Sequence, residues 1–513
     1  MSDRADLILQ NGRIFTLDPV NPWASAVAIA GDRILATGSL DEVEALRGPG
    51  TEVMDLTGRT AIPGLTDSHI HLPMYGVDEL FRADLGGCTS IGDVQDRLRK
   101  FDRERSPKWI IGRGFDHEIF AEKRFPTRTE LDEVSPDKPV VVVRLCGHAV
   151  VCNSRAIAMA EEGKLPAEGR ETGLLTEDDQ DYIFEHAPCL TTAQRTEAIL
   201  FAAERARSSG ITEVHCLISG AEDLTILQGL HAENRLPIRF YVQVPYSLLP
   251  LLSAEGLRTG DGDDRLRIGS VKMFQDGSMG AWTAGMREPF TDRPETSGLL
   301  MHAQDEMTEM VRKVHSARWQ AATHAIGDLA IETAINAYET VLRETGEDNR
   351  VRRHRIEHAS ILAEDLVARM ASLHILAAVQ PQFVLTDFWT INRVGPERYR
   401  WTYPFRTLVE AGIATSLGSD CPVERLDAFQ LIYRAVTRDA YSQSECLTVE
   451  ETIRLYALGG AYAGFEEGLR GSLEAGKLAD IVVLDTDIFG SDPSDIAKCR
   501  PTHVIIGGQY HAA

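Results

Sequence analysis

The chain has little positive charge for its size. Its 53 Lys and Arg residues are outnumbered by 77 Asp and Glu, and the formal net charge is −24 over 513 residues. Nucleic acids and anionic membranes both attract basic surfaces, so neither is expected as a partner. The chain also lacks an uninterrupted apolar run of about 18 residues, the length of a membrane-spanning helix.

Other signals are missing as well. The first residues, MSDRADLILQNGRIF, lack the charged-then-apolar layout of a secretion signal, so we expect a cytoplasmic protein. The eight cysteines contain no CxxC pair, so we expect reduced thiols rather than disulfides or a cysteine-bound metal. No glycine-rich phosphate-binding turn follows an early strand, which disfavours an open doubly wound sheet, the alternative α/β fold.

The two ends of the chain share a β-rich pattern. Alternating apolar and polar residues surround an Asn-Gly turn in DLILQNGRIFTLD, and similar patterns occur in LADIVVLDTDIF and PTHVIIGGQYH. Such segments at both ends of a long chain indicate one small domain built from both termini. We therefore expect a composite β-sandwich from residues 1–62 and 470–513.

The middle of the chain, residues 63–469, alternates apolar strands with amphipathic helices. This alternation is typical of an α/β fold and predicts a (β/α)₈ TIM-like barrel. The eight expected strands lie at 61–71, 139–148, 211–216, 267–274, 320–325, 353–359, 374–381 and 413–420. Residues 72–138 and 149–210 would then be long loops after strands 1 and 2, suited to form lids or substrate walls.

Histidines gather where these strands end, which is where barrel active sites form. Residues 69 and 71 share one face of a strand because side chains alternate with a period of two, so this pair can hold a metal ion. The potential ligands or neighbours at strand ends are His69, His71, His148, His215, Lys272, His324, His358 and Asp420. Imidazoles with a carboxylate favour zinc, and other divalent metals also fit this set.

Lys272 needs a separate explanation, because an ammonium group would repel a cation. A neutral lysine can react with CO₂ to form a carbamate, and the carbamate's oxygens can bridge two metal ions. The other interpretation is a solvated lysine at the end of a strand. His215 is interpreted as a packing residue, and Asp276 either assists the reaction or only shapes the turn in QDGS.

The ordered motifs PGLTDSHIH, KMFQDGS, THAIGD, RIEHA and GSDCPV resemble those of the amidohydrolase superfamily, in particular amidohydrolase family 3, the YtcJ-like branch that includes N-substituted formamide deformylases. The resemblance covers nearly the whole chain. It implies a first metal on His69, His71 and Asp420, and a carboxylated Lys272 bridging to a second metal on His324 and His358. Two Zn²⁺ per chain are therefore expected, with Asp420 as proton shuttle and His148 facing the substrate.

The expected function is hydrolysis of a non-peptide C–N bond, such as that of an N-acyl or N-formyl amide, by water activated at the metal. Three alternatives stay open: a one-metal deaminase of an amidine-like ring, a hydrolase of carbamates, lactams or esters, and a metal-binding regulator without turnover. The expected partner is a small-molecule substrate, and a homodimer is the default assembly.

Overall fold

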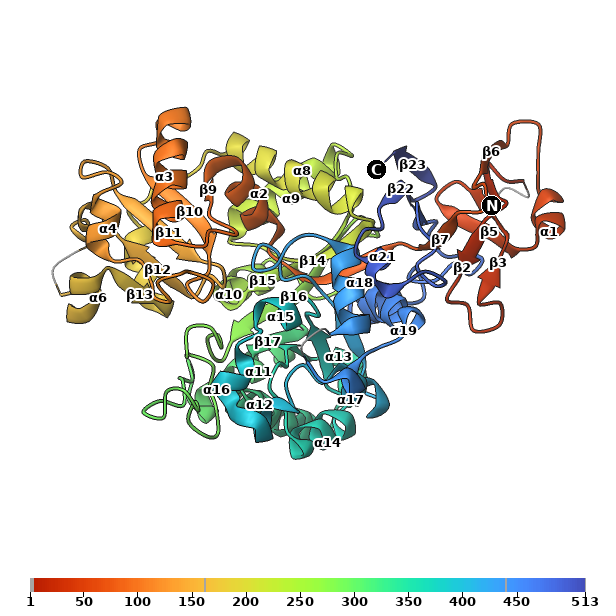
Figure 1. The fold of residues 1–513 in the computed structure, drawn as a ribbon. Helices are drawn as coiled ribbons and strands as arrows, with labels where there is room; N and C mark the ends of the chain where they lie inside the picture. Colours follow the sequence, from red (N-terminus) through yellow and green to blue (C-terminus); the bar gives the residue numbers. More distant parts are fainter. Residues whose placement is uncertain (1–3, 161–162, 439–440, 513) are drawn as a thin grey trace.

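The chain forms three structured regions (Figure 1). A computed structural model describes residues 4–160, 163–438 and 441–512. A barrel with its helices lies in the middle of Figure 1, an inserted α/β region lies at the left, and β-sheets built from both termini lie at the right. No helix among the described residues has the length and apolar character needed to cross a membrane.

The central sheet consists of eight parallel strands in the order β20-β19-β18-β17-β16-β15-β14-β8. It confirms the predicted α/β fold with an eight-stranded barrel. Its members are β8 (Leu65–Ile70), β14 (Ile211–Leu217), β15 (Arg239–Pro245), β16 (Leu266–Phe274), β17 (Ala321–Ala325), β18 (Arg355–His358), β19 (Leu376–Val379) and β20 (Thr415–Leu417). Hydrogen bonds from Asp420 N to His69 O (2.7 Å) and from His71 N to Cys421 O (2.8 Å) join the first strand to the last.

One predicted barrel strand is wrong. Residues 139–148 form β11 (Val140–Arg144) and the turn after it. Outside the barrel, β11 pairs with β10 (Ile110–Phe115) and β12 (Ala149–Cys152). The strand missed by the prediction is β15, which pairs with β14 and β16. The predicted loops 72–138 and 149–210 are consequently one continuous insertion between the first two barrel strands.

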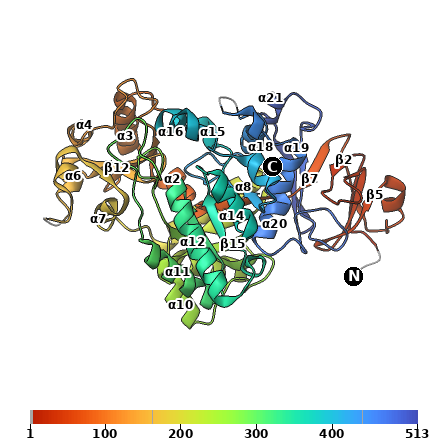
Figure 2. The same cartoon turned by 90° about the horizontal axis from the view of Figure 1, so that it is seen from below.

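Helices surround the barrel (Figure 2), where α11, α12 and α14 lie along its outside. The helix α12 ends at Gly346, whose φ of 68° provides the left-handed C-cap expected of glycine. The longer helices next to the barrel are α2 (Leu72–Phe81), α8 (Thr192–Ser208), α9 (Ala221–Ala232), α10 (Leu249–Ala254), α11 (Gln304–Ser316), α12 (Asp328–Thr345), α14 (Glu364–Ser372), α16 (Thr390–Tyr399), α17 (Phe405–Glu410), α18 (Ala428–Thr437) and α19 (Val449–Arg454).

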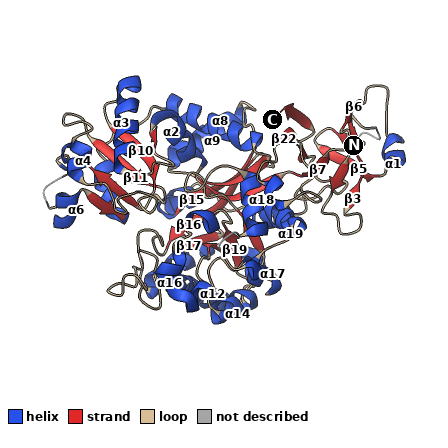
Figure 3. Cartoon of the chain, in the orientation of Figure 1, coloured by secondary structure: helices blue, strands red, loops and turns tan. Residues whose placement is uncertain are grey.

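The insertion has a sheet of its own (Figure 3). Its apolar side chains form separate clusters. Its five strands, in the order β13-β12-β11-β10-β9, are β9 (Ala83–Asp84), β10 (Ile110–Phe115), β11 (Val140–Arg144), β12 (Ala149–Cys152) and β13 (Leu174–Thr176). The helices α3 (Ile91–Arg105), α4 (Arg128–Asp132), α5 (Ser154–Ile157), α6 (Ala167–Thr172) and α7 (Asp181–Phe184) accompany them. This region is therefore a folded unit, and the turn between β11 and β12 carries His148.

Both termini contribute to one six-stranded sheet, β23-β22-β21-β7-β2-β3, and a second sheet has the order β5-β4-β1-β6. Their apolar side chains form a shared core. The strands are β1 (Leu7–Gln10), β2 (Arg13–Phe15), β3 (Trp23–Ala24), β4 (Ala26–Ala30), β5 (Arg33–Gly38), β6 (Glu52–Asp55), β7 (Thr60–Pro63), β21 (Ile481–Leu484), β22 (Pro501–Ile506) and β23 (Gln509–Ala512).

A buried ion pair connects this terminal region to the barrel. Arg239 of β15 donates from Nε and Nη2 to the two carboxylate oxygens of Asp480, at 2.8 and 3.0 Å. Asp480 lies directly before β21, and both side chains are about 95% buried or more. The pair therefore joins two regions that are 241 residues apart in the sequence.

Asp480→Asn should destabilise the protein by about 3–5 kcal/mol, because it removes the carboxylate that is hydrogen-bonded to the buried Arg239 guanidinium and leaves it with the more distant Asp264, whose Oδ1 is 3.9 Å away. Urea unfolding measures this loss. The matched control is Glu344→Gln, which removes one member of an exposed pair with Arg312 and should change stability little. Equal stabilities for Asp480→Asn and the parent would contradict a role of this pair in holding the two regions together.

Candidate metal centre and active site

The seam between β8 and β20 carries a compact set of metal-binding side chains. Ligand atoms of His69, His71 and Asp420 all lie within 4.8 Å of one another. His71 Nε2 is 3.1 Å and His69 Nε2 is 3.4 Å from the same oxygen, Asp420 Oδ1. His69 and Asp420 are buried, and His71 is partly exposed.

The chemistry of this set fits a cation. Glu357 can only accept a hydrogen bond, so a neutral His69 carries its proton on Nδ1, which lies 2.5 Å from Glu357 Oε2. His69 Nε2 then presents a lone pair to Asp420 Oδ1, a buried oxygen with no hydrogen-bond partner in the part of the chain that the structure describes. Lone pairs that converge in a buried site repel one another unless a positive ion lies between them.

The remaining predicted ligands lie beside this set. Lys272 Nζ is 3.4 Å from His69 Nε2. The ring of His358 is 4.9 Å from that of His69 and 4.5 Å from that of His324, measured between centroids. All six predicted ligands thus lie at one end of the barrel, where β8, β16, β17, β18 and β20 end.

Other groups fix the orientation of these imidazoles. His324 Nε2 contacts the carbonyl oxygen of Gly277 at 3.0 Å, which leaves Nδ1 for the site. His358 Nδ1 lies 2.8 Å from the side-chain oxygen of Gln380, which leaves Nε2 for the site. Neither Gly277 nor Gln380 was predicted from the sequence.

Two site residues have left-handed backbones. The φ angle is 58° at Asp420 and 75° at His358. Residues with a side chain seldom adopt this conformation, and it is enriched where function requires it. At His358 the backbone departs from strand geometry. Its imidazole therefore does not follow the alternation of β18, in which Arg355 and Glu357 share the interior face.

Burial shifts the pKa values of two basic groups of the site. It lowers the pKa of Lys272 to about 8 and that of His71 to about 4. Burial also raises the pKa of Asp420, but contacts with His69 and His71 outweigh it and leave that pKa well below its usual range. A neutral imidazole and an ionised carboxylate are the forms that bind metal.

Other polar residues near the site have structural contacts. Asp276 accepts hydrogen bonds from the backbone N–H groups of Gly285 (2.9 Å), Ile326 (3.0 Å) and Gly327 (2.8 Å), so it holds three loop segments together. His215 is buried, and its Nδ1 accepts a hydrogen bond from Arg355 at 2.9 Å. Asp276 Oδ1 also lies 3.4 Å from Nε2 of the predicted ligand His324, whereas His215 reaches the site through Arg355.

A cavity of about 50 Å³ opens onto the metal-binding residues. Its walls include His148, whose ring is 5.6 Å from that of His324, and several apolar side chains: Leu145, Met279, Ile326, Phe383 and Val423. A larger groove of about 880 Å³, between the insertion and the barrel mouth, shares Leu145 and Val423 with it. His148 thus reaches the barrel mouth from the insertion and not from a barrel strand.

The chain matches the amidohydrolase family over residues 52–511. It is 32% identical to the putative amidohydrolase YtcJ of Bacillus subtilis, with 98% of each chain covered. It is 27% identical to the N-substituted formamide deformylase of Arthrobacter pascens, covering 99% of this chain and 98% of the relative. An uncharacterised metal-dependent hydrolase from Pyrococcus horikoshii shares the fold, with a TM-score of 0.80, 29% identity, and 95% and 99% of the two chains covered. The chain therefore belongs to the amidohydrolase family, and it is a metal-dependent hydrolase that acts on carbon–nitrogen bonds.

Proposed function

We propose that this hydrolase cleaves the C–N bond of a small N-acyl or N-formyl amide. The observation that carries the proposal is that ligand atoms of His69, His71 and Asp420 lie within 4.8 Å of one another and that Asp420 lines the cavity. His69, His71 and Asp420 would hold one divalent ion, and a carboxylated Lys272 would connect it to a second ion held by His324 and His358. The preferred metal is zinc. Bound there, the metal would acidify water and polarise a carbonyl oxygen.

The chain's own residues have separate tasks in this mechanism. Asp420 orients the attacking water and accepts its proton, then delivers that proton to the leaving nitrogen. His148 faces the cavity and donates a hydrogen bond to the carbonyl oxygen as negative charge develops there. The apolar walls exclude bulk water, which strengthens both interactions.

The size of the two spaces bears on the substrate. A cavity of about 50 Å³ accommodates the reacting amide and a small acyl group, since one water needs about 10–15 Å³ on the same scale. The rest of the molecule can extend into the groove between the insertion and the barrel. The apolar walls at Leu145, Phe383 and Val423 favour an uncharged, hydrophobic substituent close to the reacting bond.

His148→Ala should lower kcat about 10²- to 10³-fold, the usual cost of removing a donor to a developing oxyanion. The metal content should stay at the parent value, because His148 is not among the proposed ligands. Steady-state kinetics and elemental analysis measure the two effects. An unchanged kcat would remove His148 from the mechanism.

A substrate screen tests the proposal as a whole. N-formyl, N-acetyl and bulkier N-acyl derivatives of one aromatic amine should be hydrolysed with kcat/KM falling as the acyl group grows, as amine release would show. Matched esters, carbamates and amidine-like rings should be poorer substrates. Turnover of an amidine-like ring alone would favour the deaminase alternative and contradict the proposal.

A further inference from the structure

A buried carboxylate lies directly behind the first histidine of the site. Glu357 of β18 is fully buried, and its Oε2 accepts a hydrogen bond from His69 Nδ1 at 2.5 Å. Its other oxygen, Oε1, is 2.6 Å from Nε of Arg355. Glu357 is thus held between a guanidinium and an imidazole, and it faces away from the cavity that the substrate would occupy.

Glu357 differs from the groups that hold the other imidazoles. His358 contacts the neutral amide of Gln380, and His324 contacts the backbone carbonyl of Gly277. His69 Nδ1 lies 2.5 Å from the Glu357 carboxylate, whereas the carboxylate beside His324, Asp276 Oδ1, is 3.4 Å from Nε2 of that ring. A carboxylate at this position increases the electron density on the opposite nitrogen and fixes the ring orientation, which a neutral partner does more weakly.

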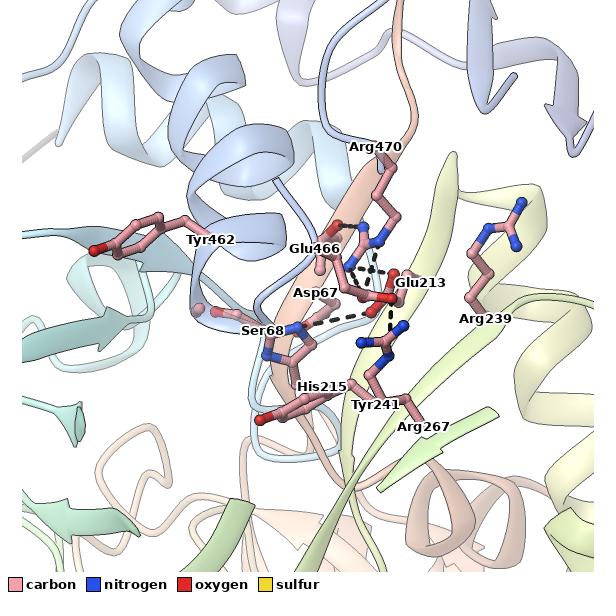
Figure 4. Close-up of polar contacts among 12 residues, drawn as sticks. Asp67, Ser68, Glu213, His215, Arg239, Tyr241, Arg267, Tyr462, Glu466 and Arg470 are labelled. Atoms are coloured by element: carbon pink, nitrogen blue, oxygen red, sulfur yellow. Dashed lines mark hydrogen bonds and ion pairs between the residues drawn. The ribbon is translucent and has the colours of Figure 1, made fainter. Parts of the chain in front are cut away.

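The surroundings prevent Glu357 from moving away. Besides contacting Glu357, Arg355 donates to His215 Nδ1 (2.9 Å) and to the backbone oxygen of Ser68 (3.1 Å). Figure 4 shows Arg470 above His215, in contact with Glu213 and Glu466, with Arg267 on the other side of the two carboxylates. A continuous set of polar contacts inside the barrel therefore supports Glu357, from Arg355 through His215 to Glu213.

We propose that Glu357 is a positioning residue that fixes the tautomer and orientation of His69 and thereby sets the affinity of the site for its metal. The inference rests on the proposed function, in which His69 is a ligand. Glu357 does not line the cavity, so it acts through the groups around it, of which His69 is hydrogen-bonded to it. Arg355 and His215 hold Glu357 in place.

Glu357→Gln tests this inference, because glutamine retains an oxygen that accepts from His69 but lacks the negative charge. Competition with a coloured zinc chelator should show affinity for Zn²⁺ reduced about 10- to 100-fold. At saturating Zn²⁺, kcat should recover most of its parent value with KM unchanged. Gln380→Met, which removes a neutral partner from His358, should reduce zinc affinity less than Glu357→Gln does.

Asp480→Asn is the matched control, since it also removes a buried carboxylate that pairs with an arginine. It should lower stability and leave zinc affinity within about twofold of the parent. If Glu357→Gln does not fold, the double variant Arg355→Met/Glu357→Gln replaces it with the same expected loss, because no unpaired charge stays buried.

The outcomes distinguish the inference about Glu357 from the proposed function. A folded Glu357→Gln protein with parent zinc affinity overturns the inference and leaves the proposed function intact. An equal loss of affinity in Asp480→Asn also overturns it, because the effect would then belong to any lost buried charge. A parent protein that binds no Zn²⁺, Mn²⁺, Co²⁺ or Ni²⁺ overturns the proposed function and the inference with it.

Discussion

Asp420→Asn should reduce turnover about 10³- to 10⁴-fold while the protein stays folded. Asparagine has nearly the same shape and keeps one oxygen that can face His69 and His71. It cannot accept a proton from water or return one to the leaving nitrogen. Steady-state hydrolysis of the best amide from the screen measures the loss, and circular dichroism with elemental analysis measures fold and metal content.

Asp427→Asn is the control for this substitution. Asp427 is the N-cap of α18, where it accepts hydrogen bonds from the backbone of Phe429 and Gln430 at 3.1 Å each. Asparagine caps a helix about as well as aspartate, so stability and turnover should both stay near the parent values. Full activity in Asp420→Asn would show that another group transfers the proton.

Lys272→Ala should lower turnover by more than about 100-fold, because even an outer-shell partner of a metal usually contributes 10- to 100-fold. The variant should also bind one metal per chain where the parent binds two, since alanine cannot form the bridging carbamate. Lys272 is 1% exposed and lies among His69, Glu357 and Asp420, so no solvent-facing role accounts for it. Elemental analysis and amide hydrolysis measure the two effects.

Formation of the carbamate also requires CO₂, and this requirement can be tested on the parent enzyme. The neutral amine and CO₂ form the carbamate and release one proton, so metal-stripped parent should regain activity faster when bicarbonate accompanies the metal. Lys313→Ala is the control, because this lysine is exposed on α11. Two metals and parent activity in Lys272→Ala would contradict the bridge.

Much of the fold was predictable because most strands and helices have regular patterns. The apolar segment before His69 and the strands that carry Lys272, His324 and His358 are barrel strands as predicted. The error concerns residues 139–148, the most apolar of the eight predicted strands. PVVVV suggested a barrel strand, yet it is buried between the helices of the insertion, which has a core of its own.

The missed strand shows why apolar runs mislead in this protein. In β15 the residues Arg239, Tyr241 and Gln243 alternate with Phe240, Val242 and Val244, and all six are buried. Barrel interiors are usually filled by branched apolar side chains, so a polar face there resembles a solvent-exposed strand. The interior of this barrel contains charged pairs, and an alternation of polar and apolar residues does not by itself distinguish such an interior from a solvent-exposed face.

The site residues at the strand ends were predictable from the sequence. The residues that contact them from inside the barrel were less predictable. His69 and His71 are two residues apart in the sequence, and this spacing predicts that they lie on the same face of a strand. The same spacing in R-I-E of β18 and E-V-H of β14 could have identified Glu357 and His215 as interior groups. The partner of Glu357 is 288 residues away, however, and only the closed barrel brings the two together.

The central claim is that amide hydrolysis takes place at a metal centre built from these strand ends. The most direct test is titration of the metal-stripped protein with Zn²⁺ while the release of amine from an N-acyl amide is followed. We expect no release of amine without metal, and a rate that rises to saturation at two equivalents of Zn²⁺ per chain. Undiminished release from the metal-free protein, or no release from the fully loaded protein with any amide of the screen, would contradict it.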